Sequence, residues 1–136
     1  MASGGPSIEA VQHVAEFRAA LRRFLRRTEK IARSADLTPQ RYLLLLMIKG
    51  APSGSGSATV TELSQQLQLA QSTVTELVSR AEEVGLVERE QSNSDARVAN
   101  LRLTAEGERR LALSFTGLED ERRELQAAFR HLDQAR

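Results

Sequence analysis

The chain has 136 residues, of which 40% are hydrophobic and 27% charged, and its formal net charge is +1. This composition is typical of a folded globular protein, and any affinity for nucleic acid must come from local patches. The sequence contains no cysteine and only two histidines, which excludes disulfides and thiol-based redox sensing. We predict no metal site, no cofactor and no enzymatic activity, because no nucleophile–base pair or phosphate-binding glycine motif is present.

The length suits one compact unit or one domain with appended helices. The first residues, MASGGPS, lack the basic start and apolar core of a signal peptide, and the longest apolar run, 42–48, is too short to cross a bilayer. We therefore expect a cytoplasmic protein that does not contact membranes.

Apolar residues predict a long first helix. They recur in steps of three and four from Ile8 to Ile31, which indicates an amphipathic helix that ends near Arg33. Thr38 is a suitable N-cap and Pro39 a suitable first residue for a second helix. Its segment YLLLLMI is apolar on all sides, so we expect it to be buried on all sides, and Gly50 is expected to end it.

Residues 50–58 form a Gly/Ser-rich stretch that predicts a flexible loop. A mobile cover over a ligand is one interpretation, and we favour the other, a tolerated surface insertion. A very short strand is predicted at 58–60, and Thr61 is the expected N-cap of a short helix. After a tight turn at 69–72, another helix carries Val74, Leu77, Val78 and Ala81 on one face and stops at Gly85.

Two short strands, 86–90 and 99–103, are expected to form a β-hairpin, and Thr104 is expected to cap the helix that follows. In the C-terminal region leucines recur every seven residues and phenylalanines lie between them, which predicts an apolar seam, with Gly117 as a point where the helix breaks or bends. The seam residues are Leu111, Phe115, Leu118, Leu125, Phe129 and Leu132. Its partner is either the first helix of the same chain or the same helix of a second subunit.

The order helix, turn, helix and hairpin is that of a winged helix-turn-helix. The second of these helices turns small polar residues outward near its N-terminus, where they can reach base edges in the major groove while free N–H groups face phosphate. The predicted DNA-binding residues of this helix are Gln71, Ser72, Thr73, Thr75, Glu76, Ser79 and Arg80.

Residues 63–111 resemble the DNA-binding lobe of MarR-type transcription regulators. The family's Gly-Leu-Val-x-Arg stretch is present at 85–89, and its wing pattern Asp-x-Arg is present as Asp95-Ala96-Arg97, followed by Leu-Thr at 103–104. Three positions depart from the family pattern. Ala70 lies where a Ser or Thr cap is common, which favours a helix start at Ser72, and Ala96 lies where an Arg is common. Glu76 replaces a common basic residue, and its carboxylate either accepts from a cytosine amino group or repels phosphate. The resemblance implies a homodimer with interlocked terminal helices and two winged lobes on a pseudo-palindromic operator.

Asp95 and Arg97 add a mechanism to the predicted wing. A carboxylate two residues away holds the guanidinium in a planar arrangement, and the held arginine then enters the narrow minor groove, where negative potential is concentrated. The competing interpretation is an exposed ion pair that contributes less than about 1 kcal/mol.

The charge of the lobe favours an alternative. Residues 54–104 hold four arginines against seven carboxylates, a net charge of −3, whereas DNA-binding surfaces are usually basic. A winged-helix module that binds another protein, without specific DNA binding, is therefore the second hypothesis.

A basic stretch lies in the first helix, where residues 18–33 hold seven basic residues against one acid, a net charge of +6. One interpretation is a solvated face that pairs with the acidic stretch 119–124. The other is a site for a small anionic or aromatic effector, because the resemblance implies an effector pocket near this helix and the lobe. The candidate lining residues are Arg23, Arg26, Arg41 and Tyr42.

Together these patterns predict a mainly α protein with a small β-hairpin (α+β). We expect an N-terminal dimerisation helix in residues 1–36, a winged helix-turn-helix lobe in 37–104 and C-terminal dimerisation helices in 105–136. The predicted function is a sequence-specific transcription regulator, a repressor or an activator with the repressor favoured, that binds double-stranded DNA as a homodimer and is released by a small-molecule effector. His13 and His131 are expected to be surface residues.

Overall fold

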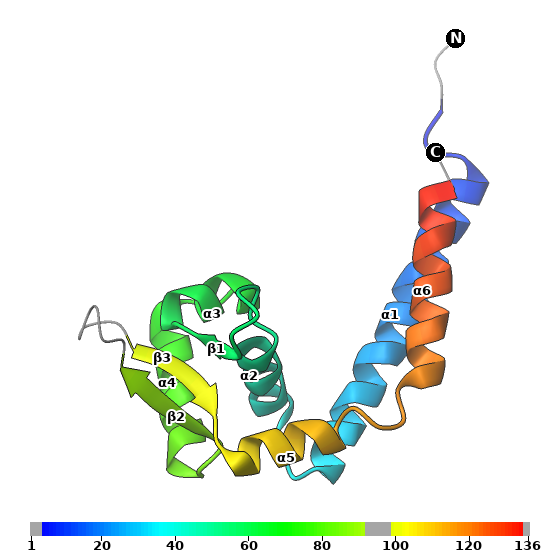
Figure 1. Ribbon diagram of the computed structural model, residues 1–136. Coiled ribbons are helices and arrows are strands. Elements are labelled where there is room, and N and C mark those ends of the chain that lie inside the picture. The colour runs from blue at the N-terminus through cyan, green and yellow to red at the C-terminus, as the bar shows by residue number, and fades with distance from the viewer. Residues whose placement is uncertain (1–3, 92–98, 135–136) are drawn as a thin grey trace. The chain divides into compact units, whose positions relative to one another are not determined.

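The computed structural model describes residues 4–91 and 99–134 (Figure 1). These residues divide into two compact units: a winged unit, residues 32–115, and a terminal-helix unit, residues 1–31 with 116–136. The elements in chain order are α1 (Ile8–Ser34), α2 (Pro39–Lys49), β1 (Ser57–Ala58), α3 (Val60–Leu67), α4 (Gln71–Glu83), β2 (Val87–Gln91), β3 (Ala99–Leu103), α5 (Ala105–Leu113) and α6 (Glu119–Gln134). The mainly helical fold with a small antiparallel sheet is the one predicted.

The winged unit is built around aliphatic side chains from every one of its elements. Its sheet has the order β1-β3-β2, with antiparallel pairs at Ser57↔Arg102 and Val87↔Leu103. Leu45 and Ile48 of α2 are fully buried, together with Leu63 of α3. Helix α2 contacts α3, α4, α5 and the sheet, so it is the central element that holds the others in place.

Helix α2 begins as expected but is not buried on all sides. Thr38 Oγ1 accepts a hydrogen bond from Arg41 N at 3.2 Å, and Pro39 occupies the first turn. Leu43, however, is 40% exposed, while Leu45 is fully buried. The expectation of burial all round was wrong, because the other elements of the unit leave one face of α2 uncovered.

The start of α3 differs from the prediction. The N-cap is Thr59, whose hydroxyl accepts from Glu62 N at 3.2 Å while Glu62 Oε1 accepts from Thr59 N at 2.8 Å. This reciprocal capping box starts the helix at Val60, so Thr61 lies inside the helix and is not its cap. The strand before it is also displaced, to Ser57–Ala58.

Helix α4 begins at Gln71, one residue before the predicted Ser72. Its N-cap is Ala70, which supplies no side-chain hydrogen bond. The end is as predicted, because Gly85 follows the last turn with φ of +76°, a left-handed conformation that glycine adopts without strain. The 50–58 stretch forms turns in which Ser55 Oγ lies 2.8 Å from Ser53 Oγ and 3.0 Å from Ser57 Oγ.

The predicted break at Gly117 is confirmed, and it divides the leucine seam between the two units. Gly117 has φ of +85° and separates α5 from α6. Leu111 is buried in the core of the winged unit, and Leu118 is buried within the terminal-helix unit. The seven-residue spacing therefore continues across the break, but it does not describe one continuous helix.

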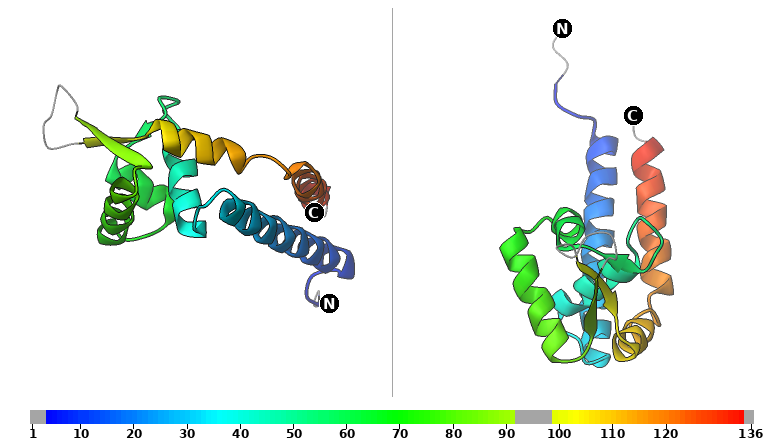
Figure 2. Two further views of the ribbon diagram at one scale, coloured as in Figure 1. Left: turned by 90° about the horizontal axis from the view of Figure 1, so that it is seen from below. Right: turned by 60° about the vertical axis from the view of Figure 1, so that its left-hand side comes forward.

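In the terminal-helix unit α1 and α6 lie side by side (Figure 1; Figure 2). The rings of Phe17 and Phe129 meet edge to face with centroids 6.1 Å apart, and Arg23 Nε donates to Glu124 Oε1 at 2.5 Å. The latter contact confirms, for this pair, that the basic face of α1 pairs with the acidic stretch of α6. The small residues Ala20 and Ala128 are buried.

The two histidines, one on each of these helices, contact each other, and the His131 side chain is 44% exposed. Their ring centroids are 5.8 Å apart, and His131 Nδ1 lies 2.9 Å from Glu16 Oε1. The Nδ1 atom of His13 is buried and has no hydrogen-bond partner among the described residues. The pairing of α1 with α6 brings these two residues together although they are more than a hundred positions apart in the sequence.

The boundaries between the two compact units lie after residues 31 and 115. Helix α5 therefore belongs to the winged unit, where it packs against the sheet. The predicted division by role, with boundaries at 36 and 104, stays a prediction. None of the helices in residues 4–91 and 99–134 combines the length and apolar character needed to span a bilayer.

Candidate nucleic-acid interface

Helix α4 presents one apolar and one polar face. Val74, Val78 and Ala81 are buried in the core of the winged unit, which fixes the rotation of the helix about its axis. The predicted DNA-contacting side chains are consequently turned outward. Six are exposed and the seventh, Ser79, is half-buried; the exposed six are Gln71, Ser72, Thr73, Thr75, Glu76 and Arg80.

Two contacts organise this face. Arg80 Nη2 donates to Glu76 Oε1 at 2.6 Å, and both side chains are more than 60% exposed. Gln71 Nε2 donates to Thr61 Oγ1 at 3.3 Å, which joins the start of α4 to α3. The hydroxyls of Ser72, Thr73 and Thr75 are exposed beside them, so the first turns of α4 present small hydrogen-bonding groups.

The side of α4 that faces α2 contains a hollow of about 200 Å³. It is lined by Thr73, Glu76, Leu77 and Arg80 of α4, together with Gln40 of α2. Gln40 is exposed and adds an amide to the polar face. Sequence reasoning missed this residue, because its position beside α4 follows from the packing of α2 and not from any local pattern.

The predicted wing residues Asp95 and Arg97 lie outside the described residues. The strands that lead to them are described: β2 and β3 pair in register from Val87↔Leu103 to Gln91↔Ala99. These strands are the predicted hairpin, with the first displaced by one residue from the predicted range 86–90.

Two arginines of this region form ion pairs with carboxylates of the same region, which leave its net charge of −3 unchanged. Arg89 Nε donates to both carboxylate oxygens of Glu82 at 3.1 Å, and Arg102 Nη1 donates to Glu90 Oε2 at 2.8 Å. The turn after α4 brings Arg89 to Glu82, and the register of the hairpin brings Arg102 to Glu90. These two arginines are therefore already engaged within the fold.

Comparisons with known proteins agree with this geometry. The MarR family model matches residues 35–98. An uncharacterised HTH-type transcriptional regulator, YsmB of Bacillus subtilis (strain 168), is 32% identical over 103 residues, which cover 73% of this chain and 68% of that protein. The chain belongs to the MarR family.

Solved structures of known proteins, MarR from E. coli among them, have the same fold. A mutant of MarR from E. coli complexed with operator DNA superposes with a TM-score of 0.67 at 21% identity, over 86% of this chain and 87% of that one. The YusO protein from Bacillus subtilis superposes with a TM-score of 0.64 at 25% identity, over 88% and 90%.

The four predicted effector residues of this MarR-family chain belong to both units: Arg23 and Arg26 to the terminal-helix unit, and Arg41 and Tyr42 to the winged unit. Arg23 is engaged by Glu124, and Tyr42 is buried in the core of the winged unit. Arg26 lines a hollow of about 600 Å³ along α1, and Arg41 lines a different hollow, of about 380 Å³, in the winged unit.

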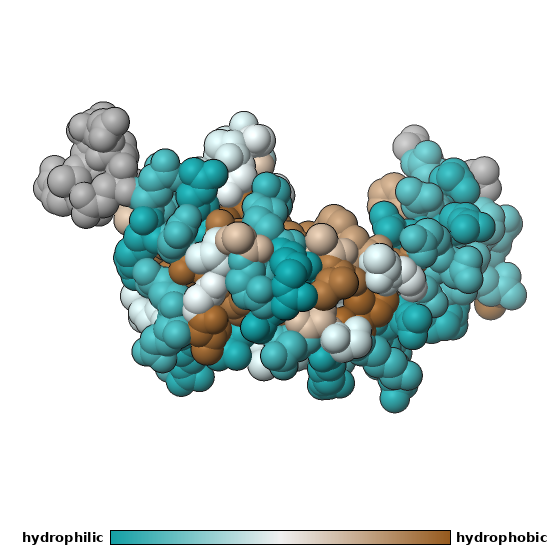
Figure 3. Space-filling view, turned by 60° about the horizontal axis from the view of Figure 1, so that its bottom comes forward, coloured by the Kyte–Doolittle hydropathy of each residue, from teal (hydrophilic) through white to brown (hydrophobic). Residues whose placement is uncertain are grey.

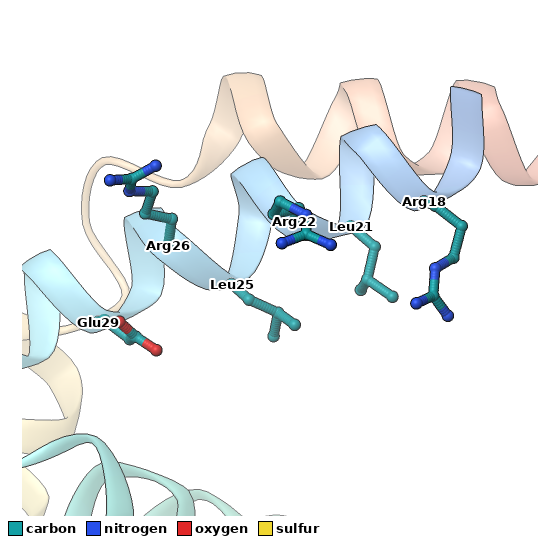
Figure 4. Close-up of a pocket in the computed structure, with 6 residues that line it drawn as sticks. All are labelled: Arg18, Leu21, Arg22, Leu25, Arg26 and Glu29. Atoms are coloured by element: carbon teal, nitrogen blue, oxygen red, sulfur yellow. The ribbon is translucent and has the colours of Figure 1, made fainter. Parts of the chain in front are cut away.

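The hollow along α1 combines charged and apolar side chains. Figure 4 shows Arg18, Leu21 and Leu25 on the side of α1 that faces away from α6, with Arg22 close by. Leu25 is 49% exposed. No group of three or more histidine or acidic side chains with the placement of a metal site occurs in the part of the chain that the structure describes.

Proposed function

We propose that this MarR-family chain is a sequence-specific DNA-binding repressor that acts as a homodimer on a pseudo-palindromic operator and is released by a small effector. The observation that carries the proposal is the rotation of α4. Burial of Val74 and Val78 leaves the small polar residues of its first turns exposed, where a helix entering the major groove needs them.

Individual side chains on this face suit different contacts. Ser72 and Thr75 are short enough to let the helix approach base edges closely. The carboxylate of Glu76, which accepts a hydrogen bond from Arg80, can also accept one from a cytosine amino group. Arg80 remains more than 60% exposed and has further N–H groups that can donate to phosphate or base.

For the wing we propose that Asp95 orients Arg97 so that it enters the minor groove. The paired strands β2 and β3 supply a rigid base for this contact. An arginine delivered to the minor groove gains from the concentrated negative potential there.

For the assembly we propose that the terminal-helix unit binds a second copy of itself. Ile8, Val11 and Val14 of α1 are each about half exposed or more, and Phe129 of α6 is 62% exposed. Figure 3 shows that hydrophobic side chains also reach the surface on one face of the molecule, among mostly hydrophilic neighbours. A dimer would place two α4 helices on half-sites one helical turn apart, roughly 34–36 Å.

For the effector we propose a small anion with an aromatic or apolar part. The hollow along α1 supports this chemistry, because Arg22 and Arg26 supply charge while Leu21 and Leu25 supply apolar surface. A screen of small organic acids for release of bound DNA tests this step, and Arg26→Ala is expected to abolish the release by any acid that binds there.

The decisive experiment is a gel shift with the DNA upstream of the chain's own gene. We expect a shift that Arg80→Ala and Arg97→Ala each weaken by about 1–3 kcal/mol, which is roughly five- to 150-fold in Kd. The matched control is Arg109→Ala, because Arg109 is also exposed and also paired with a glutamate of its own helix.

Two outcomes would contradict parts of the proposal. An unchanged shift with Arg97→Ala would remove the wing mechanism alone. No binding to any DNA at low ionic strength would instead favour the protein-interaction module that the acidic excess of the lobe suggests.

A further inference from the structure

The basic residues of the winged unit fall into two classes. Six of the eight that lie in the described part of this unit form ion pairs, with partners on the same helix, a neighbouring strand or another helix. The other two, Arg33 and Arg41, have no ion-pair partner within the described ranges 4–91 and 99–134. Within the described part of the winged unit, the positive charge that is not engaged in an ion pair is therefore that of Arg33 and Arg41.

Arg33 and Arg41 line the same hollow, of about 380 Å³, at the corner between α1 and α2. The corner is held by several hydrogen bonds. Leu37 N donates to Ala32 O at 2.8 Å, and Arg110 Nη1 donates to Asp36 O at 3.1 Å. The two arginines are thus presented from a fixed turn.

This corner adjoins the proposed DNA-contacting face. Gln40, the residue before Arg41, lines the hollow beside α4 together with Thr73, Glu76 and Arg80. The first turn of α2 therefore lies between the α4 face and the hollow that holds Arg33 and Arg41. We propose that Arg33 and Arg41 bind phosphates of the duplex whose major groove α4 enters, an inference that rests on the proposed function.

The charge balance supports this assignment. The region 54–104 carries a net charge of −3, and Arg80, Arg89 and Arg102 within it are already paired with carboxylates. Phosphate contacts supply most of the sequence-independent affinity for DNA, and an unpaired arginine can make them without breaking an existing ion pair. Its planar group also donates to phosphate in a bidentate manner.

Asp36 allows a second test of the hollow that holds Arg33 and Arg41, in which the expected change in DNA affinity has the opposite sign. Its side chain is 94% exposed, it lines the hollow with the two arginines, and its only described ion pair is a long one of 3.7 Å to Arg110. A carboxylate there repels a bound phosphate. Asp36 has φ of +59°, a conformation that asparagine adopts readily, so Asp36→Asn removes the charge without straining the backbone.

The experiment measures Kd over a series of KCl concentrations for two labelled duplexes of equal length, one selected by the protein from random DNA and one unrelated. For Arg33→Ala, Arg41→Ala and the double variant, we expect the slope of log K against log salt to shrink by about 0.9 for each phosphate that the variant no longer binds. Affinity for both duplexes falls by the same factor, whereas Asp36→Asn tightens both. Arg33→Lys with Arg41→Lys retains the slope, and Arg109→Ala leaves it unchanged.

The outcomes separate this inference from the proposed function. If the wild-type protein binds neither duplex at low salt, both are overturned. If it binds and the double alanine variant, shown by its thermal melt to be folded, has an unchanged slope, only the phosphate assignment is overturned. A further outcome would also overturn the assignment. Inorganic phosphate would raise the melting temperature of the wild type but not of the double alanine variant, while both bind DNA equally. The corner would then be a site for a small anion and not for the duplex.

Discussion

The winged unit and the terminal-helix unit bury their apolar side chains to very different extents. In the winged unit, leucines, isoleucine and valines from α2, α3, α4 and the strands form one buried cluster. In the described part of the terminal-helix unit, the buried apolar residues are only Ala20, Ile31, Leu118 and Ala128, while Ile8 is 75% and Phe129 62% exposed. The first unit has its own core, and the second presents apolar surface, which the proposed second copy of the chain would cover.

This difference matches the proposed division of labour. A recognition helix must be held rigidly, and the core beneath α4 does this through Val74 and Val78. A dimerisation surface must instead remain apolar and exposed until its partner arrives.

The largest effect is expected from truncating the core of the winged unit. Leu45→Ala removes a fully buried side chain at the centre of that unit and should lower the free energy of unfolding by about 2–5 kcal/mol. Leu43→Ala is the matched control, because Leu43 lies on the same helix but is 40% exposed. Urea denaturation followed by circular dichroism measures both, and equal losses would show that the exposed face of α2 is covered in solution.

The next effect concerns the terminal-helix unit. Val14 lines an apolar hollow with Val11 and Ala15, and Val14→Asp should raise the Kd of the proposed dimer by about tenfold or more, because an unpaired charge is costly to bury. Gln12→Asp, at an exposed neighbouring position, is the control. Sedimentation velocity over a range of protein concentrations measures the Kd. A wild-type protein that stays monomeric would contradict the assignment of this surface.

Much of the winged unit was predictable from the sequence because its signals are local. Pro39 after Thr38, Gly85 after α4 and Thr104 before α5 mark element boundaries through their own backbone preferences, and the structure confirms each. The outward residues of α4 follow from the spacing of Val74 and Val78. The family pattern at 85–89 was equally local.

The failures have a common cause in tertiary packing. A run of leucines does not indicate which of them is left uncovered, so Leu43 was misassigned. The contact of His13 with His131 depends on the pairing of α1 with α6. The hollow shared by Arg33 and Arg41 depends on the turn at Asp36, whose left-handed conformation no local pattern predicted.

A smaller effect tests the corrected start of α3. Thr59→Ala removes the hydroxyl that accepts from Glu62 N and should destabilise the winged unit by about 1 kcal/mol. Thr61→Ala removes only the 3.3 Å contact with Gln71, so we expect a change of about a few tenths of a kcal/mol. Thermal unfolding of the two variants compares the caps directly, and a larger loss at Thr61 would restore the position predicted from the sequence.

The smallest effect is expected at the surface of α5, within the well-packed unit. Hydrogen bonds from Arg109 and then Arg110 lower the pKa of Glu106 from 4.5 to about 2. Because the folded pKa is depressed, the carboxylate stabilises the fold above pH 4.5, and this contribution is lost as the pH falls toward 2. Glu106→Gln should therefore lower the midpoint of thermal unfolding slightly near neutral pH and reduce its fall over the acid range. A pH dependence identical to that of the wild type would show that solvent screens this exposed cluster completely.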